Sequence, residues 1–406
     1  MHKLTGVEPT PITADEIPAF AAAIEGAFHH DPLADDVERL RRKLEPERSL
    51  VMRDGEQIVA TTSIYSRRMT VPGGELPIAG VTQVGVLATH RRRGMLTALM
   101  RRQLADIHEL GQEAVAALWA TESGIYGRFG YGVASMVAEL DVAVRDARLR
   151  SAPPAAQARL SKPADAIDAM REIHDSTRPS RPGMLDRAGP WWEIRVDDPS
   201  DDREGYGPLR AVVIEGVAYA LYSVKVKFDF DRPASEVSVR EALAVTPEGQ
   251  AAIWSFLLGL DLTRRLVYEL AAADDPLRHL ITGPEAVRER VADSLLVRLV
   301  DVPRALRERT YAAPFEVVFE LADEVCPWNA GRYALRWDGE TATCAPTALP
   351  AGLELGVAEL GAAYLGGTTL DVLARAGRVR ELRSGALAAA SRAFRSDRAP
   401  YCPEIF

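Results

Sequence analysis

Three consecutive arginines, Arg91, Arg92 and Arg93, precede a glycine and an apolar helical pattern in the stretch HRRRGMLTAL (residues 90–99). The chain as a whole is acidic, with a formal net charge of -9, so this positive spot needs a local cause. A helix that begins near Gly94 points its first backbone N–H groups and the positive end of its dipole at whatever precedes it. Arginine binds phosphate through bidentate, charge-assisted hydrogen bonds. The pattern therefore predicts a phosphate or pyrophosphate site, and the alternative is three merely solvated charges.

The segments around the arginines predict a strand, turn, helix and strand in succession. Residues 79–89 (AGVTQVGVLAT) are typical of a strand, apolar residues recur at helical spacing from 96 to 107, and residues 113–121 predict the next strand. This order is a βαβ unit. The turn has neither the GxxxxGK[ST] pattern nor the GxGxxG pattern, which excludes a P-loop and a dinucleotide fold.

A length of 406 residues exceeds one ordinary core, and we expect three domains, at 1–147, 148–298 and 299–406. Proline and alanine become frequent in the linker at 148–166. Residues 241–260 align with residues 84–103, with Pro247, Glu248 and Gly249 at the turn in place of the arginines, which suggests a duplicated fold without an anion site. Chance similarity between two βα units is the alternative. Helices are expected at 15–28, 249–266 and 384–396, and the third domain alternates as strands around a WDGE turn.

Composition narrows the class of protein. No apolar run is long enough for a membrane span, and the N-terminus has no apolar core of a signal peptide, so we expect a cytoplasmic protein that does not bind membranes. The excess of acidic over basic residues, which gives a net charge of -9, argues against a nucleic-acid partner. Cys326, Cys344 and Cys402 have no CxxC spacing and are expected to be reduced, and no histidine spacing predicts a metal site.

The arginine turn resembles the R/Q-x-x-G-x-G/A loop of the GNAT superfamily of acetyltransferases, with Leu96 where that motif has Gly or Ala. Together with WATESGIYGRFGYG (residues 119–132), the region 70–135 resembles the Eis family of GNAT enzymes, N-acetyltransferases that act on aminoglycosides and other amines. The resemblance extends more faintly along the chain. It implies an α/β (α+β) plan of two GNAT-like mixed-sheet domains, the second degenerate, followed by a sterol-carrier-protein-like α+β domain. It also implies acetyl-CoA as co-substrate, no metal, and a homohexamer.

The same resemblance assigns a cofactor site residue by residue. The backbone of one strand would pair with the pantetheine arm, the arginine turn and first helical turn would hold the pyrophosphate, and two further residues would line the thioester end. In that order these residues are Val84, Gly85 and Val86; Arg91, Arg92, Arg93, Gly94, Met95, Leu96 and Thr97; and Thr121 and Glu122.

Acetyl transfer to an amine passes through a tetrahedral intermediate and needs a base for the amine and an acid for the leaving thiolate. Tyr126 suits the acid, because the pKa of tyrosine, about 10, lies just above that of a thiol, about 8.5, so its hydroxyl can protonate or hydrogen-bond the departing sulfur without losing its own proton at neutral pH. The family resemblance assigns this role to the tyrosine of the motif. The structural alternative is an aromatic packing residue, and Tyr131 is the next candidate.

The resemblance implies that the base is the chain's own C-terminal carboxylate, that of Phe406. An α-carboxylate can accept a proton from a bound ammonium through water if its aromatic side chain anchors it. An anchored terminus would also explain the apolar ending CPEIF. Glu122, His29 and His30 remain alternative bases.

The substrate is expected to be a small cationic amine. Glu25, His29 and Asp31 lie in an acidic segment (25–38) that GNAT folds place over the acceptor site, although ordinary surface charge would give the same pattern. Two other functions remain open. The chain could be a non-catalytic acyl-CoA or lipid-binding protein, or a structural assembly module.

Overall fold

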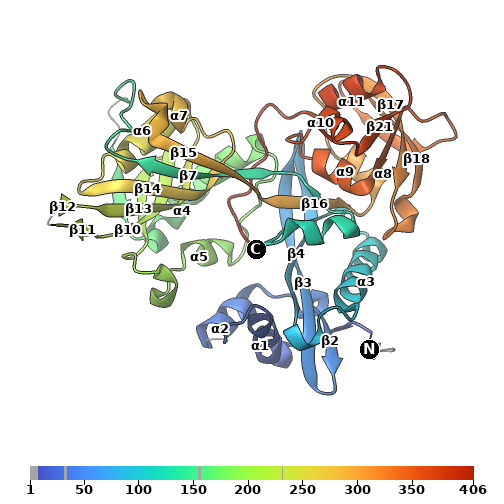
Figure 1. The fold of residues 1–406 in the computed structure, drawn as a ribbon, viewed down its shortest axis with the longest axis horizontal. Coiled ribbons are helices and arrows are strands. Elements are labelled where there is room, and N and C mark those ends of the chain that lie inside the picture. The colour runs from blue at the N-terminus through green and yellow to red at the C-terminus, as the bar shows by residue number, and fades with distance from the viewer. Residues whose placement is uncertain (1–7, 32–33, 154–156, 231) are drawn as a thin grey trace. The chain divides into compact units, whose positions relative to one another are not determined.

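A computed structural model of the chain describes residues 8–31, 34–153, 157–230 and 232–406. The chain divides into two compact units (Figure 1). Unit 1 comprises the described residues up to Ser135, residues 295–397 and Phe406, and unit 2 comprises residues 136–294 and 398–405. Within the described residues, no helix combines the length and the apolar character that a membrane crossing requires.

The first sheet of unit 1 has the order β1-β2-β3-β4-β5-β16-β6. Its strands are β1 (Thr10–Pro11), β2 (Leu50–Asp54), β3 (Gln57–Val71), β4 (Gly74–Val86), β5 (Val115–Trp119), β16 (Leu295–Leu299) and β6 (Gly132–Val133). Helices α1 (Ile17–Ala27), α2 (Ala34–Lys43) and α3 (Met95–Leu110) accompany it. Strands β4 and β5 are parallel, so helix α3 crosses between them as the predicted βαβ unit.

Helix α3 forms because its apolar residues recur on one face, and that face is buried. Its buried residues include Met95, Leu99, Met100, Leu104 and Ile107. Gly94 before the helix and Gly111 after it both have positive φ angles, of 86° and 64°, which glycine adopts without strain. These two glycines fix where the helix starts and stops, as the sequence predicts for its beginning.

A second sheet of unit 1 has the order β19-β18-β17-β20-β21. Its strands are β17 (Phe315–Ala322), β18 (Gly331–Trp337), β19 (Ala342–Pro346), β20 (Leu353–Gly356) and β21 (Val379–Glu381). The helices of this region are α8 (Val302–Arg307), α9 (Val357–Ala363), α10 (Leu370–Arg375) and α11 (Ala386–Phe394). The strands predicted around the WDGE turn and the helix predicted at 384–396 are confirmed by β18, β19 and α11.

Unit 2 contains a sheet of order β15-β7-β14-β13-β10-β9-β8 and the hairpin β11-β12. The strands are β7 (Met136–Ala143), β8 (Arg159–Ser161), β9 (Arg210–Ile214), β10 (Ala218–Lys225), β11 (Phe228–Asp229), β12 (Arg232–Pro233), β13 (Ser235–Ala244), β14 (Thr263–Ala272) and β15 (Val287–Asp293). The helices are α4 (Ile167–Thr177), α5 (Trp191–Val196), α6 (Pro247–Leu258) and α7 (Leu277–Leu280). The helix predicted at 249–266 was too long, because α6 ends at Leu258, Gly259 caps it, and residues from Thr263 belong to β14.

The borders of the units differ from the domains predicted at 1–147, 148–298 and 299–406. Strand β7 pairs with β14 and β15 in unit 2, although it lies in the first predicted segment. Strand β16 lies between β5 and β6 in unit 1, although most of it lies in the second. The chain thus places one strand of each sequence segment in the sheet of the other unit.

Candidate functional site

Strands β4 and β5 pair only over part of their length. Their parallel ladder ends at Val81 and Leu118, while β4 continues to Val86. A β-bulge between Thr61 and Ser63 of β3 distorts β4 at this point, where Gln83 has a φ of 53°. In the described chain, the edge of β4 that faces β5 has no partner strand beyond Val81. Its backbone groups can therefore pair with an extended ligand, and Val84, Gly85 and Val86 lie on this open stretch.

The C-terminal end of α1 packs against the end of β4. A Cβ atom added to Gly85 would lie 3.0 Å from the Cβ of Ala27, and one added to Gly26 would lie 3.3 Å from Leu87. Gly85 thus has a packing reason in addition to its predicted cofactor role. The contact also brings the loop after α1 to the end of β4.

The arginine turn is held by the fold around it. The His90 ring is buried and contacts the Thr89 hydroxyl at 2.8 Å and the Asp54 carboxylate at 3.1 Å. Arg91 donates hydrogen bonds to the carbonyl oxygens of Val86 (3.3 Å) and Ala27 (3.0 Å). Arg91 therefore ties the turn to β4 and α1.

The other two arginines are more available to a ligand. Arg92 is exposed and has a φ of 62°, a strained conformation for a residue with a side chain. No hydrogen bond or ion pair joins its side chain to another described residue. Arg93 is also exposed and donates to the Thr89 carbonyl oxygen at 2.8 Å. Helix α3 follows with no acidic residue in its first turn, so its N-terminal dipole and these two guanidinium groups would act on the same anion.

Tyr126 shares a hydrophobic cluster with the two other parts of the predicted site. Val84 of the open strand, Leu96 of the first turn of α3 and Tyr126 all pack against the cluster that contains Val81, Met100 and other buried residues. Tyr126 is half-buried, and burial raises the pKa of its hydroxyl to about 12. A tyrosine with this pKa is protonated at neutral pH and can donate its proton.

Tyr131 lies beside Tyr126, with ring centroids 6.0 Å apart in an edge-to-face arrangement. It is fully buried, and among the described residues its hydroxyl has no hydrogen-bond partner. Burial raises the pKa of Tyr131 well above its ordinary value. Of the two tyrosines, only Tyr126 is reached by solvent.

The glycines after Tyr126 serve packing. A Cβ atom added to Gly130, whose φ is 83°, would lie 2.7 Å from Val357 of α9 and 2.8 Å from Arg298. One added to Gly132 would lie 1.9 Å from the Ala358 carbonyl oxygen. The second half of the GIYGRFGYG motif is therefore a docking surface for α9, a role that sequence reasoning missed.

Phe406 belongs to unit 1, although the residues before it belong to unit 2. A Cβ atom added to Gly80 of β4 would lie 3.3 Å from the Phe406 ring. The side chain of Phe406 is half-buried on this strand. The predicted terminal carboxylate thus belongs to the same compact unit as Tyr126 and the arginine turn.

The remaining predicted residues lie in the last turn of α1, in the case of Glu25, and on the loops after α1 and β5. Glu25 is half-buried, and its backbone oxygen accepts from the N–H groups of Phe28 and His30. His29, which has a φ of 68°, and Asp31 are exposed, as are Thr121 and Glu122 after β5. Pro32 and Leu33, inside the predicted acidic segment, lie outside the described residues. In the parts of the chain that the structure describes, no group of three or more His, Cys, Asp or Glu side chains could hold a metal ion.

Lys43 was not anticipated from the sequence. Its ammonium lies 5.5 Å from the centroid of the Tyr65 ring. Tyr65 belongs to β3 and pairs with Gly80 of β4. Burial, together with repulsion by Arg39 and Arg67, lowers the pKa of Lys43 to about 8. A lysine at the end of a charged helix gives no sequence signal for this environment, which depends on how α2 packs.

Comparisons with known protein families support the architecture. Residues 8–134 and residues 183–299 each match an acetyltransferase (GNAT) domain, and residues 302–403 match a sterol carrier protein domain. The predicted fold class, two GNAT-like domains followed by a sterol-carrier-like domain, is therefore confirmed.

Individual relatives cover nearly the whole chain. An uncharacterized N-acetyltransferase of Streptomyces avermitilis is 45% identical over 370 residues, which cover 89% of this chain and 90% of that protein. The N-acetyltransferase Eis of Mycobacterium tuberculosis is 36% identical over 371 residues, covering 86% and 87%. The crystal structure of Eis1 from Mycobacterium abscessus superposes with a TM-score of 0.85 at 32% identity, covering 99% and 100%. The chain therefore belongs to the Eis-type N-acetyltransferases of the GNAT superfamily.

Proposed function

We propose that this N-acetyltransferase transfers the acetyl group of acetyl-CoA to amines of aminoglycosides or other polycationic molecules, with Tyr126 as general acid and the Phe406 carboxylate as general base. The observation that carries the proposal is the position of Phe406, whose ring lies against Gly80 on the strand that also carries the predicted cofactor edge. The side chain of Phe406 is half-buried there.

The residues of unit 1 fit acetyl-CoA. Acetyl-CoA supplies a reactive acetyl thioester. The open edge of β4 from Val84 to Val86 offers backbone hydrogen bonds to its extended pantetheine arm. Arg92, Arg93 and the N-terminus of α3 offer positive charge to its pyrophosphate. Thr121 and Glu122 follow the end of β5, where the ladder with β4 has already opened.

The reaction needs two proton transfers, one to a base and one from an acid. The Phe406 carboxylate accepts the proton of the attacking ammonium, directly or through one water. The Tyr126 hydroxyl donates a hydrogen bond or its proton to the sulfur that leaves. Its raised pKa, about 12, keeps it from ionising before the sulfur departs.

The acceptor, assembly and compartment are further parts of the proposal. Glu25, His29 and Asp31 would attract a polycationic amine at the loop after α1, which packs at the end of β4. We also propose a cytoplasmic homohexamer, for which light scattering on the purified protein should give six times the mass of the 44.3-kDa chain.

The terminal carboxylate can be tested by changing one functional group. Because residue 402 is a cysteine, a thioester of residues 1–401 can be ligated to the synthetic peptide Cys-Pro-Glu-Ile-Phe to regenerate the natural sequence. The peptide is used once as the free acid and once as the C-terminal amide. Release of CoA thiol is then measured with an aminoglycoside, a polyamine and a neutral monoamine as acceptors.

The ligated acid should have normal activity with the polycationic amines. The amide should bind acetyl-CoA equally well but lose at least about 100-fold in kcat, the range expected for loss of a general base. Full kcat in the amide would refute the carboxylate mechanism and return the base role to Glu122, His29 or His30. A preference for the neutral monoamine would refute the proposed acceptor class.

A further inference from the structure

Unit 2 repeats the opened strand pair of unit 1. Strands β13 and β14 are parallel and joined by α6, and their ladder ends at Val239 and Tyr268. A β-bulge opposite Leu221 and Tyr222 distorts β13 at this point, and β13 continues to Ala244. Unit 1 likewise has a β-bulge just beyond its last parallel pair. Both units therefore contain the opened strand pair that GNAT folds use for the cofactor, and in unit 2 a cleft lies there, lined by residues 242–247, Tyr268 and Ala272.

The cleft of unit 2 lacks the means to bind a pyrophosphate. Val245 and Thr246 alone connect β13 to α6, whereas residues 87–94 connect β4 to α3 and include the three arginines. The Thr246 hydroxyl caps α6 by accepting a hydrogen bond from the Gly249 amide at 3.1 Å. Glu248 adds a negative charge in the first turn. The predicted loss of the anion site thus has a structural basis, a shortened turn.

Residues 398–405, here called the C-terminal tail, bind along the wall of this cleft instead. The Tyr401 hydroxyl donates to the Leu270 carbonyl oxygen at 2.6 Å and lies 3.0 Å from the Tyr268 hydroxyl, both on β14. Tyr401 is buried in the cluster that contains Leu243 of β13 and Ala272 of β14. Its ring therefore forms part of the wall of this cleft, together with the ends of β13 and β14 and the start of α6.

The backbone of the tail is also held. The Tyr401 amide donates to the Pro182 carbonyl oxygen at 2.8 Å, and the Ala399 amide donates to Asp274 at 3.0 Å. The Arg181 side chain donates to the Ala399 carbonyl oxygen at 3.0 Å. A Cβ atom added to Gly183 would lie 3.0 Å from the Tyr401 carbonyl oxygen, so the tail follows this loop closely.

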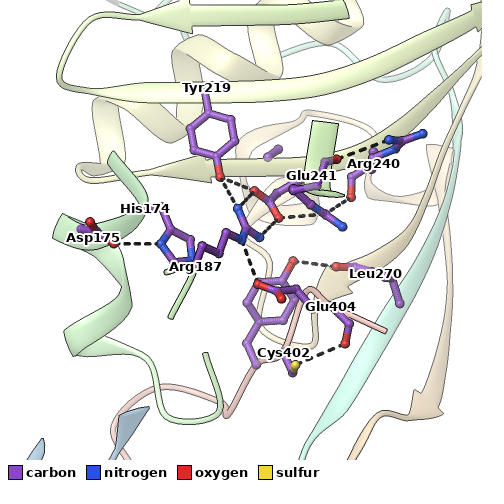
Figure 2. A network of polar contacts seen from close by, with 12 residues as sticks. His174, Asp175, Arg187, Tyr219, Arg240, Glu241, Leu270, Cys402 and Glu404 are labelled. Carbon is purple, nitrogen blue, oxygen red and sulfur yellow. Dashed lines mark hydrogen bonds and ion pairs between the residues drawn. The ribbon is translucent and has the colours of Figure 1, made fainter. Parts of the chain in front are cut away.

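A buried ionic cluster joins the tail to β13. Arg187 binds Glu241 of β13 at 2.9 Å and, through its Nε atom, Glu404 of the tail at 2.8 Å (Figure 2). Arg195 binds Glu241 from another direction at 2.8 Å. Two arginines thus face two glutamates, and the side chains of Arg187 and Glu241 are almost completely buried. Loss of one partner from such a cluster leaves an uncompensated buried charge, so Glu404 is needed for its balance.

We propose that the cofactor-like cleft of unit 2 is a receptor for the chain's own C-terminal tail, and that Glu404, Arg187 and Tyr401 are positioning residues for the terminal carboxylate. The tail takes the place that a cofactor arm would take between β13 and β14. Glu404 is separated from Phe406 by one residue, so fixing it limits where the terminus can go. The catalytic consequence rests on the proposed role of Phe406, whereas occupation of the cleft does not.

The test uses the full-length chain and two independent variants. Glu404→Gln removes the charge that balances Arg187, and Tyr401→Phe keeps the ring but removes its hydroxyl. Asp397→Asn is the control, because Asp397 is an exposed carboxylate just before the tail. Hydrogen exchange of the amides of residues 399–405, kcat, and the KM for acetyl-CoA are measured on each, with thermal unfolding to show that each is folded.

Both tail variants should exchange their tail amides at least about tenfold faster and lose kcat by a similar factor, with the KM for acetyl-CoA within about twofold of the natural value. Glu404→Asp, which restores the charge, should recover part of both effects. Calorimetry should find one acetyl-CoA site per chain. Unchanged tail exchange in both variants, or two acetyl-CoA sites, would overturn the receptor, and faster exchange with unchanged kcat would overturn the positioning role.

The amide form described above separates this inference from the proposed function. If its kcat is normal while its tail stays protected from exchange, the carboxylate mechanism fails and the receptor stands. If its kcat falls while Glu404→Gln leaves the tail protected, the carboxylate mechanism stands and the receptor fails.

Discussion

Tyr126 and Tyr131 show how the surroundings of a side chain decide its chemistry. The two rings touch, yet Tyr126 is half-buried and Tyr131 fully buried, and the Tyr131 hydroxyl has no hydrogen-bond partner among the described residues. A proton donor must reach the reacting sulfur, which a closed core position prevents. The two residues should therefore respond differently to loss of the hydroxyl.

Tyr126→Phe should lower kcat by about 100-fold or more, while the KM for acetyl-CoA changes by less than about twofold, because only the proton for the leaving sulfur is lost. Steady-state kinetics with thiol detection measure both constants. Tyr131→Phe is the matched control and should keep its kcat. A normal kcat in Tyr126→Phe would show that this tyrosine only packs.

The pH dependence of kcat should reflect the raised pKa of the Tyr126 hydroxyl. Because its pKa is raised to about 12, the hydroxyl stays protonated where an ordinary tyrosine ionises, near pH 10. The rate should therefore not decline between pH 9 and pH 11, provided the protein remains folded. A fall in kcat centred near pH 10 would contradict the environment described for Tyr126.

Replacing both Arg92 and Arg93 with alanine should raise the KM for acetyl-CoA by about 10- to 100-fold, since two charge-assisted contacts to phosphate are removed. The KM for the amine should stay the same. Arg101→Ala, which removes an exposed arginine from α3, provides the control. An unaltered acetyl-CoA KM in the double variant would exclude the arginine turn as the phosphate site.

The sequence motif led to the arginine turn but not to the separate task of Arg91. Its hydrogen bond to Ala27 joins residues 64 positions apart, and no local pattern encodes that contact. Phe406 could be suggested only through the family resemblance, because a terminal carboxylate leaves no pattern of its own. Lys43 acquires its lowered pKa mainly from burial, which depends on tertiary packing.

At the scale of elements, helix α9 and strand β6 lie so close together that a side chain at Gly132 of β6 would collide with the backbone of α9. Gly132→Ala should destabilise unit 1 by several kcal/mol, because its Cβ would collide with the Ala358 backbone, which cannot move away cheaply. Thermal unfolding measures the change. Gly124→Ala in the same motif is the control, since nothing lies near its Cβ position. Equal melting temperatures of the two variants would argue against this docking.

Asp275, just after β14, should make the stability of unit 2 depend on pH. Burial raises its pKa to about 6 from an ordinary value near 3.8, so the folded state resists ionising it. The resulting stability is complete below about pH 4 and is lost as the pH rises through 6. Asp275→Asn should therefore stabilise the protein at pH 7.5, by about 1–3 kcal/mol, and have little effect at pH 4. Denaturant unfolding at the two pH values tests this, and an equal effect at both would refute it.

Most elements followed from periodicity and turn residues, as the confirmed strands β18 and β19 and the helices α1 and α11 illustrate. The helix expected at 249–266 was extended wrongly because TRRL fits either a helix or a strand. The sheet of unit 2 decides the matter, since residues from Thr263 pair with β13 and β7. A local sequence pattern cannot show whether such a segment will extend a helix or pair with distant strands.

On the scale of the whole molecule, strands β7 and β16 lie in sheets that the linear order does not suggest. A fragment of residues 1–147 lacks β16, so β6 loses the strand it pairs with and β5 keeps only its pairing with β4. The fragment also carries β7 without its partners β14 and β15. This fragment should not unfold cooperatively, in contrast to the full chain, when followed by circular dichroism. A sharp thermal transition in the fragment would contradict the pairing of β16. Composition marked a linker after residue 147, but a strand that pairs elsewhere leaves no compositional trace.

The position of β16 also governs how the protein can be made. The first sheet of unit 1 cannot be completed until the ribosome has added residue 299, and at roughly 5–20 residues per second β5 and β6 wait on the order of ten seconds for their partner. In the proposed mechanism the base is the terminal carboxylate of Phe406, a group that exists only after the chain is released from the ribosome. Under the proposed mechanism the enzyme gains its base at the termination of translation, so a nascent chain is inactive however much of it has folded.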